Sequence, residues 1–250
     1  MVGQRVLVAH QPAYLPWQGF FSRLLDGVDE LVLLDHVQFS ERGWQNRNLV
    51  RNAAGPRPVR LTVPVRRRFG QSIADVELAD QPWAQRHWRT LSQTYARAPY
   101  WPHYRQPLQA VYDSPWQRLA ALNEALLRLL LEAFGLPVRL VSSTTLAPRG
   151  KQTAMLIDLC RRRDATVLRV GTGAVTYLDQ ALLAEHGIET QIATYTHPRY
   201  GTARGWMPGL SALDLLLHEG PDNAASVLCD GARTEPPVTG TQVTGTEVKR

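Results

Sequence analysis

The sequence has few of the residues that mark secreted or membrane-spanning proteins. It contains two cysteines in 250 residues, Cys160 and Cys229, and they lie far apart. Two distant cysteines predict neither a disulfide framework nor a paired-cysteine metal site, and they favour a reducing compartment. No run of 18 apolar residues is present, and the N-terminus lacks the apolar core of a signal peptide. We therefore expect a cytoplasmic chain without a metal and without a membrane partner.

Lysine is also scarce. Of the 28 basic residues only Lys151 and Lys249 are lysines, and all the others are arginine. A lysine amine can lose its proton when it is desolvated and can then act as a nucleophile or a base, whereas a guanidinium cannot. Lys151, placed just before an expected helix, is therefore a candidate catalytic residue. The alternative is a lysine retained by chance in a loop.

The net charge of +6 and the pI near 9.7 raise the question of nucleic-acid binding. The arginines are dispersed and their runs are short, which is typical of a solvated surface rather than of a basic stripe. An anionic small substrate fits this charge equally well. We expect no nucleic-acid partner, with a non-catalytic nucleic-acid binder kept as an alternative.

Apolar strands alternate with amphipathic helices along the chain. Strands are expected at 5–9, 30–34, 59–65, 138–142, 166–170 and 189–195. Helices are expected at 20–25, 82–95, 116–134, 153–163, 177–186 and 210–218, with turns over 99–104. This alternation predicts an α/β fold with a mostly parallel, doubly wound sheet flanked by helices, and a helical insertion around 80–135.

The chain is expected to form one α/β domain over residues 1–220, with the helical subdomain at about 80–135. From residue 221 onward Gly, Pro, Thr and Ser dominate. That composition predicts a disordered tail over 221–250. The oligomeric state is not predicted by the sequence.

Three polar segments follow three expected strands. The first begins at His10 and the second at Asp35, and the third consists of Gly171, Thr172 and Gly173. Ligands of doubly wound sheets bind beyond the carboxyl ends of the strands, so these segments predict a site at one rim. His10 is the candidate acid or base, with a structural histidine as the alternative. Asp35 would orient His10 or hold a substrate amine, and the glycine segment is a candidate phosphate loop.

Several long motifs make the sequence resemble the WbqC-like protein family. They are the segments at 10–20, 34–39, 44–48, 61–64, 151–153, 177–179, 197–200 and 211–216. Amide and aromatic side chains cluster in the 44–48 segment, which favours a binding loop over a structural turn. The motifs supply the candidates for substrate binding: Gln11, Tyr14, Trp17, Gln38, Trp44, Gln45, Asn46, Arg47, Asn48, Tyr177, Asp179 and His197. The sequence departs from the family at His36, where a second aspartate is frequent.

The resemblance implies an enzyme of surface-glycan or specialised-metabolite biosynthesis. Without a catalytic cysteine or metal site, His10, Asp35 and Lys151 suit C–N bond formation, in which a small-molecule amine attacks an acyl or carbonyl carbon to give an amide or an imine. The amine substrate could carry an anionic group. A weaker similarity to nucleotidyltransferases such as pantothenate synthetase leaves a nucleotide-dependent transferase as the alternative, with ATP as its cofactor. No other cofactor is expected.

Overall fold

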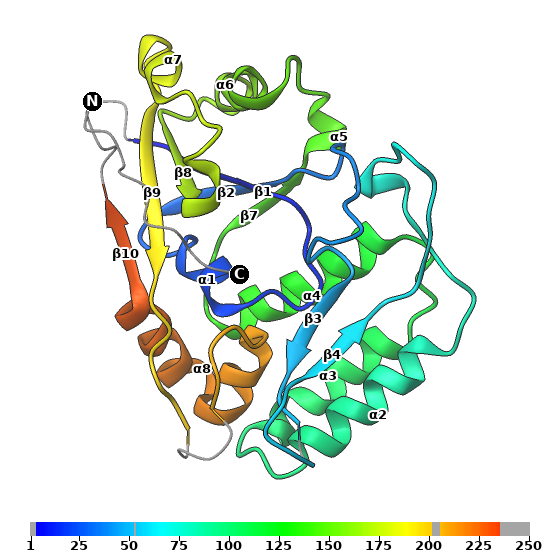
Figure 1. Cartoon of the computed structure of the whole chain (residues 1–250). Coiled ribbons are helices and arrows are strands. Elements are labelled where there is room, and N and C mark those ends of the chain that lie inside the picture. The colour runs from blue at the N-terminus through cyan, green and yellow to red at the C-terminus, as the bar shows by residue number, and fades with distance from the viewer. Residues whose placement is uncertain (1–3, 53, 202–205, 236–250) are drawn as a thin grey trace.

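One mixed sheet organises the chain, and the computed structural model describes residues 4–52, 54–201 and 206–235 (Figure 1). The strand order is β10-β9-β8-β1-β2-β7, and every neighbouring pair is parallel except β10 with β9. This confirms the α/β class and the mostly parallel sheet. The strands are β1 (Val6–His10), β2 (Val28–Leu33), β7 (Arg139–Ser142), β8 (Val167–Gly171), β9 (Glu189–Tyr195) and β10 (Ala232–Glu235).

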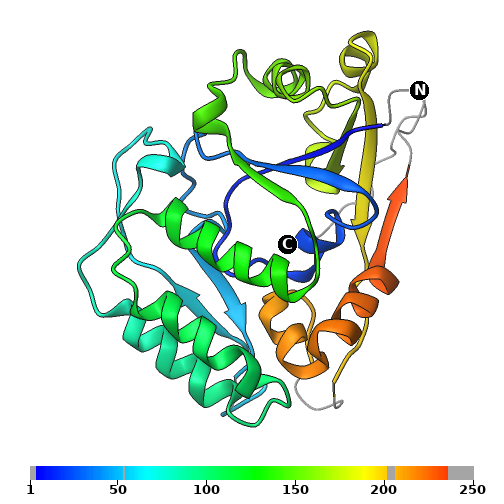
Figure 2. The same cartoon turned by 180° about the vertical axis from the view of Figure 1, so that it is seen from behind.

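Helices cover both faces of the sheet (Figures 1 and 2). Successive side chains of β1 enter two different apolar cores, because side chains alternate across a strand. Val6 and Val8 belong to one core, and Leu7 belongs to the other. The first core is closed by α1 (Gln18–Ser22), α4 (Leu119–Ala133) and α8 (Ala212–Gly231), and the second by α6 (Gln152–Arg162) and α7 (Gln180–Glu185). The sheet is therefore doubly wound.

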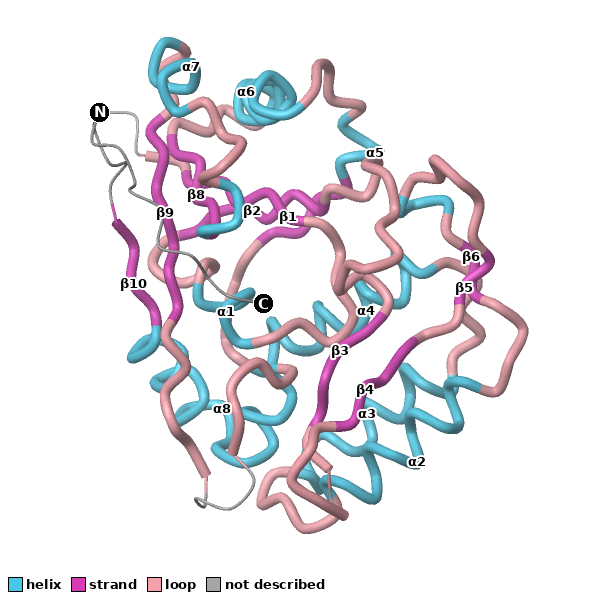
Figure 3. Tube along the Cα trace, in the orientation of Figure 1, coloured by secondary structure: helices cyan, strands magenta, loops and turns pink. Residues whose placement is uncertain are grey.

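Between β2 and β7 the chain leaves the sheet and builds the expected helical insertion (Figure 3). Two small hairpins come first, and helices follow. Figure 2 shows α4 between the sheet and the two helices α2 and α3 of this insertion. The elements are β3 (Arg47–Val50), β4 (Val59–Thr62), β5 (Val65–Arg66), the 3-10 turn η1 (Ile73–Asp75), β6 (Glu77–Leu78), α2 (Trp83–Tyr95) and α3 (Trp101–Asp113).

At two places the secondary structure differs from the expected one, and proline explains both differences. The strand expected over 59–65 breaks at Pro64 into β4 and β5, since proline cannot donate to a strand ladder. The turns expected over 99–104 are instead the start of α3. Its Pro102 lies in the first helical turn, where the amide would lack an intrahelical partner anyway.

The disordered tail expected from residue 221 does not hold for its first part. Helix α8 continues past a kink at Gly220 to Gly231, with Ala224 and Leu228 fully buried. Strand β10 then pairs with β9 over four residues. The buried apolar side chains and the strand ladder stabilise this segment despite its composition. Residues 236–250 lie outside the described residues.

Within the described part of the chain, no helix combines the length and the apolar character needed to cross a membrane.

Candidate functional site

A cavity of about 390 Å³ lies at the carboxyl ends of neighbouring parallel strands. It brings together two of the three segments expected at one rim, those after β1 and β8. Helix α6 supplies the opposite wall. The lining residues are Ala9, His10, Gln11, Arg23, Leu34, Gln152, Met155, Leu156, Val170, Gly171, Gly173, Ala174 and Tyr177.

His10 ends β1 and presents one ring nitrogen as an acceptor. Its Nδ1 lies 2.7 Å from the carbonyl oxygen of Gln11, so Nδ1 carries the proton and Nε2 is the free lone pair of the neutral ring. The ring of Phe20 packs edge-on at 4.9 Å and fixes the imidazole plane. Burial, followed by the charge of Arg23, lowers the pKa of His10 to about 3, against the raising effect of the Gln11 carbonyl. The imidazole is therefore neutral at physiological pH.

Arg23 follows α1 and is the one cationic side chain among the residues that line the cavity. Its Nε donates to the carbonyl oxygen of Gly19 at 3.2 Å. Burial lowers the pKa of Arg23 to about 10, and the guanidinium stays charged at neutral pH. The lining contains no Asp or Glu, and Arg23 forms no ion pair with any residue that the structure describes.

Gly171 ends β8 directly against this guanidinium. A Cβ at position 171 would lie 2.7 Å from Nη2 of Arg23, whereas a Cβ at Gly173 would meet nothing within 4 Å. The close approach of the arginine therefore depends on the glycine at 171. Thr172 opens the 3-10 turn η2 (Thr172–Ala174) and does not line the cavity. Of the candidate phosphate loop, Gly171 and Gly173 reach the site.

Two side chains stand at the mouth of the cavity. Tyr177 is 57% exposed and contributes to the wall beside Arg23. Gln152, the first residue of α6, has a left-handed backbone with φ of 50°. Such a conformation is unfavourable for a residue with a side chain and is frequent at functional sites.

Asp35 lies at the same rim, but its carboxylate turns away from the cavity. One oxygen accepts hydrogen bonds from the backbone amide and the hydroxyl of Thr144, both at 2.9 Å, and from the Ser143 hydroxyl at 2.9 Å. The other accepts from the Ser142 hydroxyl at 2.5 Å. Burial alone would raise the pKa of Asp35, but these hydrogen bonds outweigh it and hold the pKa below its ordinary value. The carboxylate anchors α5 (Ser143–Leu146) to β2 and is not brought to His10.

Lys151 is not among the lining residues. Its side chain is exposed at the N-terminus of α6, and the neighbouring Gln152 reaches the cavity instead. The burial that the amine hypothesis requires is therefore missing. His36, where the resemblance led us to expect a second aspartate, contacts the Ser143 hydroxyl through Nδ1 and the Met155 sulfur through Nε2.

The amide-rich segment from Trp44 to Asn48 fastens the loop after β1 rather than lining the cavity. Gln45 donates to the side-chain oxygen of Gln11 at 2.7 Å. This contact fixes Gln11, whose backbone carbonyl accepts the hydrogen bond from His10. Asn48 donates to the carbonyl oxygens of Tyr14 and Leu15, at 3.1 and 2.6 Å. These contacts make the segment a support for the His10 loop.

The remaining candidates for substrate binding lie elsewhere. Tyr14 is fully buried, with its hydroxyl bonded to His87 and Tyr112, and Asn46 donates to the Val63 carbonyl. Trp17 and His197 stack against each other at 5.3 Å. Asp179 caps α7 through the Leu182 amide. Gln38, Trp44 and Arg47 do not line the cavity, and Trp44 is 50% exposed.

Sequence reasoning missed Arg23, Gln152 and Met155 as cavity residues. One signal for Arg23 was present, since it is the one charged residue in the apolar stretch 20–25. A charge inside a buried stretch needs a partner or a ligand. Gln152 and Met155 carry no such signal, because their place follows from how α6 packs on the sheet.

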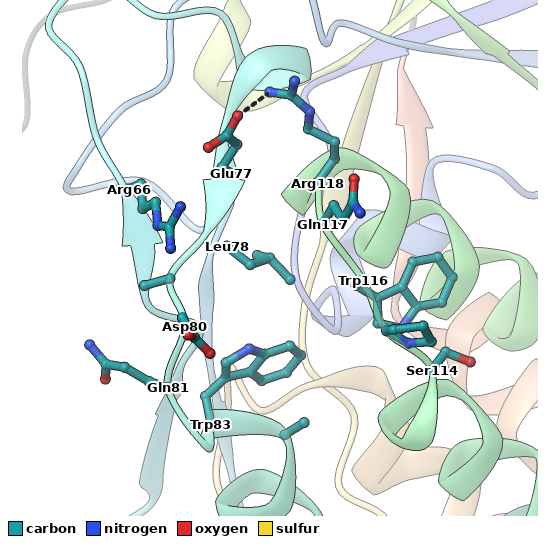
Figure 4. Close-up of a pocket in the computed structure, with 13 residues that line it drawn as sticks. Arg66, Glu77, Leu78, Asp80, Gln81, Trp83, Ser114, Trp116, Gln117 and Arg118 are labelled. Carbon is teal, nitrogen blue, oxygen red and sulfur yellow. Dashed lines mark ion pairs between the residues drawn. The ribbon is translucent and has the colours of Figure 1, made fainter.

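A second hollow, of about 480 Å³, lies in the helical insertion. Trp83 and Trp116 stand on opposite sides of it, and the ion pair between Glu77 and Arg118 spans 3.6 Å at its edge (Figure 4). It shares no lining residue with the first cavity, and none of the sequence-predicted site residues reaches it. Among the described residues, no group of three or more His, Cys, Asp or Glu side chains is arranged to hold a metal ion.

Comparison with known proteins agrees with the motifs. Residues 11–226 match the WbqC-like protein family. A curated protein of Mycobacterium tuberculosis, described as uncharacterized protein Rv1507c, is 30% identical over 217 residues, which cover 85% of this chain and 93% of that protein. No solved structure shows a significant match. The family match spans β2, β7, β8 and β9 of the sheet, the helical insertion and most of α8, and the chain belongs to the WbqC-like protein family.

Proposed function

We propose that the chain is a small-molecule biosynthetic enzyme that forms a C–N bond in the cavity beside His10. An amine attacks an acyl or carbonyl carbon, and the product is an amide or an imine. Membership of the WbqC-like family favours a biosynthetic role. The observation that carries the reaction class is the free Nε2 lone pair of His10, a residue that lines a cavity without a lining carboxylate.

The proton movements can be assigned to this one nitrogen. When the amine nitrogen bonds to the carbonyl carbon, it becomes positively charged, and Nε2 of His10 accepts one of its protons. The imidazolium then returns the proton to the departing group. In amide formation that group is the leaving group of the acyl donor. In imine formation the first proton goes to the former carbonyl oxygen and makes it a hydroxyl, and a second proton from the nitrogen follows the same route, so that the hydroxyl departs as water. A positioned acid–base residue of this kind contributes roughly 10²–10⁴-fold to the rate.

The low pKa of His10 fits a base that becomes effective only with a ligand in place. Arg23 is one of the two causes that lower this pKa. A negatively charged substrate near Arg23 would offset that contribution and raise the basicity of Nε2.

The test is a reaction screen with the purified full chain. Amines are paired with acyl thioesters, esters or aldehydes, with and without ATP and Mg²⁺. Products are read by mass spectrometry, and imines are trapped by mild reduction. The wild type is expected to give one amide or imine product, and His10→Gln should lose at least about 10²-fold in turnover while remaining folded. His103→Gln, on the exposed side of α3, is the matched control. Equal turnover of His10→Gln and wild type would contradict the proposal.

A further inference from the structure

Arg23 differs from three other buried or half-buried arginines in the groups that its guanidinium contacts. Arg51 pairs with Asp214, Arg163 pairs with Glu30, and Arg169 donates to backbone carbonyls and to Gln191. The Arg23 guanidinium has a single hydrogen bond, from Nε to the Gly19 carbonyl, among the residues that the structure describes. Arg23 is half-buried, and a charge partly removed from water without a counter-ion is unfavourable, so a ligand of opposite charge would stabilise it.

The position of this guanidinium is fixed by the fold. Arg169, on β8, donates to the carbonyl oxygens of Arg23 and Asp26, at 3.4 and 3.2 Å, and holds the turn after α1 against the sheet. On the other side the Arg23 guanidinium packs against the backbone of Gly171, which has no Cβ. The fork of N–H donors is thus oriented before a ligand arrives, which lowers the entropic cost of binding.

We propose that Arg23, seated on Gly171, is an oxyanion subsite that binds a carboxylate or phosphoryl group of the substrate. The inference rests on the cavity assigned under the proposed function and specifies its substrate class. A guanidinium presents two parallel N–H donors that match the oxygens of both groups. A cavity of about 390 Å³ suits a small molecule that reaches both Arg23 and His10.

Gly171→Ala gives a sharp test. The backbone at 171 has φ of −86° and ψ of 167°, which alanine adopts freely. The three atoms nearest to the added Cβ all belong to the guanidinium of Arg23, and this end of a flexible side chain can move aside without disturbing the backbone. The variant should therefore remain folded while the guanidinium is displaced from its seat.

Gly173→Ala separates this subsite from a phosphate loop. Its Cβ meets nothing within 4 Å and leaves Arg23 in place. If the backbone of residues 171–173 cradled the anion, both alanines would weaken binding. If Arg23 binds the anion, Gly171→Ala should weaken it and Gly173→Ala should not.

The experiment is a titration of the full chain with inorganic phosphate, acetate and ATP, followed by calorimetry and by the NMR signals of His10. We expect saturable binding of phosphate or acetate by the wild type. Arg23→Gln and Gly171→Ala should each weaken binding at least tenfold with unchanged circular dichroism. The control Arg60→Gln, which removes an exposed arginine of β4, should stay within twofold.

Comparing the titrations with acetate and with phosphate also identifies the anion. Stronger binding of acetate indicates a carboxylate substrate, and stronger binding of phosphate indicates a phosphoryl group. Absence of saturable binding by the wild type, or equal binding by wild type, Arg23→Gln and Gly171→Ala, would overturn the subsite. Because binding is measured without turnover, failure of the C–N reaction screen leaves this result unaffected, and the two proposals can fail separately.

Discussion

The Asp35 carboxylate accepts two hydrogen bonds from Thr144, one from its backbone amide and one from its hydroxyl, each at 2.9 Å. Hydroxyls of Ser142 and Ser143 complete the set. Four hydrogen bonds from the protein, three of them to one oxygen, hold this carboxylate, and its role is to join β2, β7 and α5.

Asp35→Asn is therefore expected to affect stability more than turnover. Asparagine keeps the shape but replaces one charged acceptor oxygen by an NH₂ donor, and hydrogen bonds to a charged group contribute about 1.5–3 kcal/mol each. We expect the free energy of unfolding in urea at pH 7 to fall by about 1–3 kcal/mol. The turnover of the folded variant should remain within a few-fold of the wild type. Unchanged stability together with a loss of turnover would restore a catalytic role for Asp35.

Lys151→Arg should leave turnover near the wild-type value, because the lysine is exposed and does not line the cavity. The substitution keeps the positive charge and removes the amine chemistry. The measurement is the rate of product formation with the substrate pair found in the screen. A collapse of the rate would show that the amine enters the site during the reaction.

Asp214→Asn should be strongly destabilising. Asp214 is fully buried and holds Arg51 through two hydrogen bonds of 2.9 Å, while the Tyr200 hydroxyl donates to the same carboxylate. Removing the charge breaks the buried ion pair between Asp214 and Arg51, which costs about 3–5 kcal/mol.

The matched control for Asp214 is Glu124→Gln, which breaks the exposed pair with Arg128 on α4. An exposed pair of this spacing contributes at most about 0.5 kcal/mol. Urea unfolding measures both variants. Similar small losses for the two would show that the buried pair does not stabilise the fold.

Acidification should destabilise the protein through His87, which burial holds at a pKa of about 4. An unfolded histidine has a pKa near 6.5, so below that pH the unfolded chain binds a proton that the folded chain does not. The stability contributed by the neutral ring is present above pH 6.5 and is lost as the pH falls toward 4, by up to about 1.4 kcal/mol per pH unit. His87→Gln should show a shallower fall in the free energy of unfolding between pH 7 and 5. A fall as steep as in the wild type would contradict this assignment.

The sheet and the rim could be predicted from the sequence because they depend on local patterns. The apolar strands end at His10 and Gly171, and parallel order brings these ends together. The orientation of Asp35 could not be predicted, since its donors Ser142 to Thr144 come from β7 and α5, more than 100 residues away in the sequence. The role of Asn48 was missed for the same reason, because its partners Tyr14 and Leu15 lie in another loop.

The ordered C-terminal segment shows a second limit. Residues 221–235 have the composition of a linker, yet Leu228 is buried and Ala232 to Glu235 pair with β9. Tertiary contacts outweigh composition there, and a single sequence does not contain that information.

The proposed chemistry depends most directly on the protonation of His10, which ¹⁵N NMR of histidine-labelled protein measures, with His10→Gln identifying the signal. The account predicts a proton on Nδ1 and an unprotonated Nε2 throughout pH 5–8 in the free protein, because burial and Arg23 lower the pKa to about 3. A proton on Nε2, or an ordinary titration near pH 6.5, would contradict the assignment of His10 as the base.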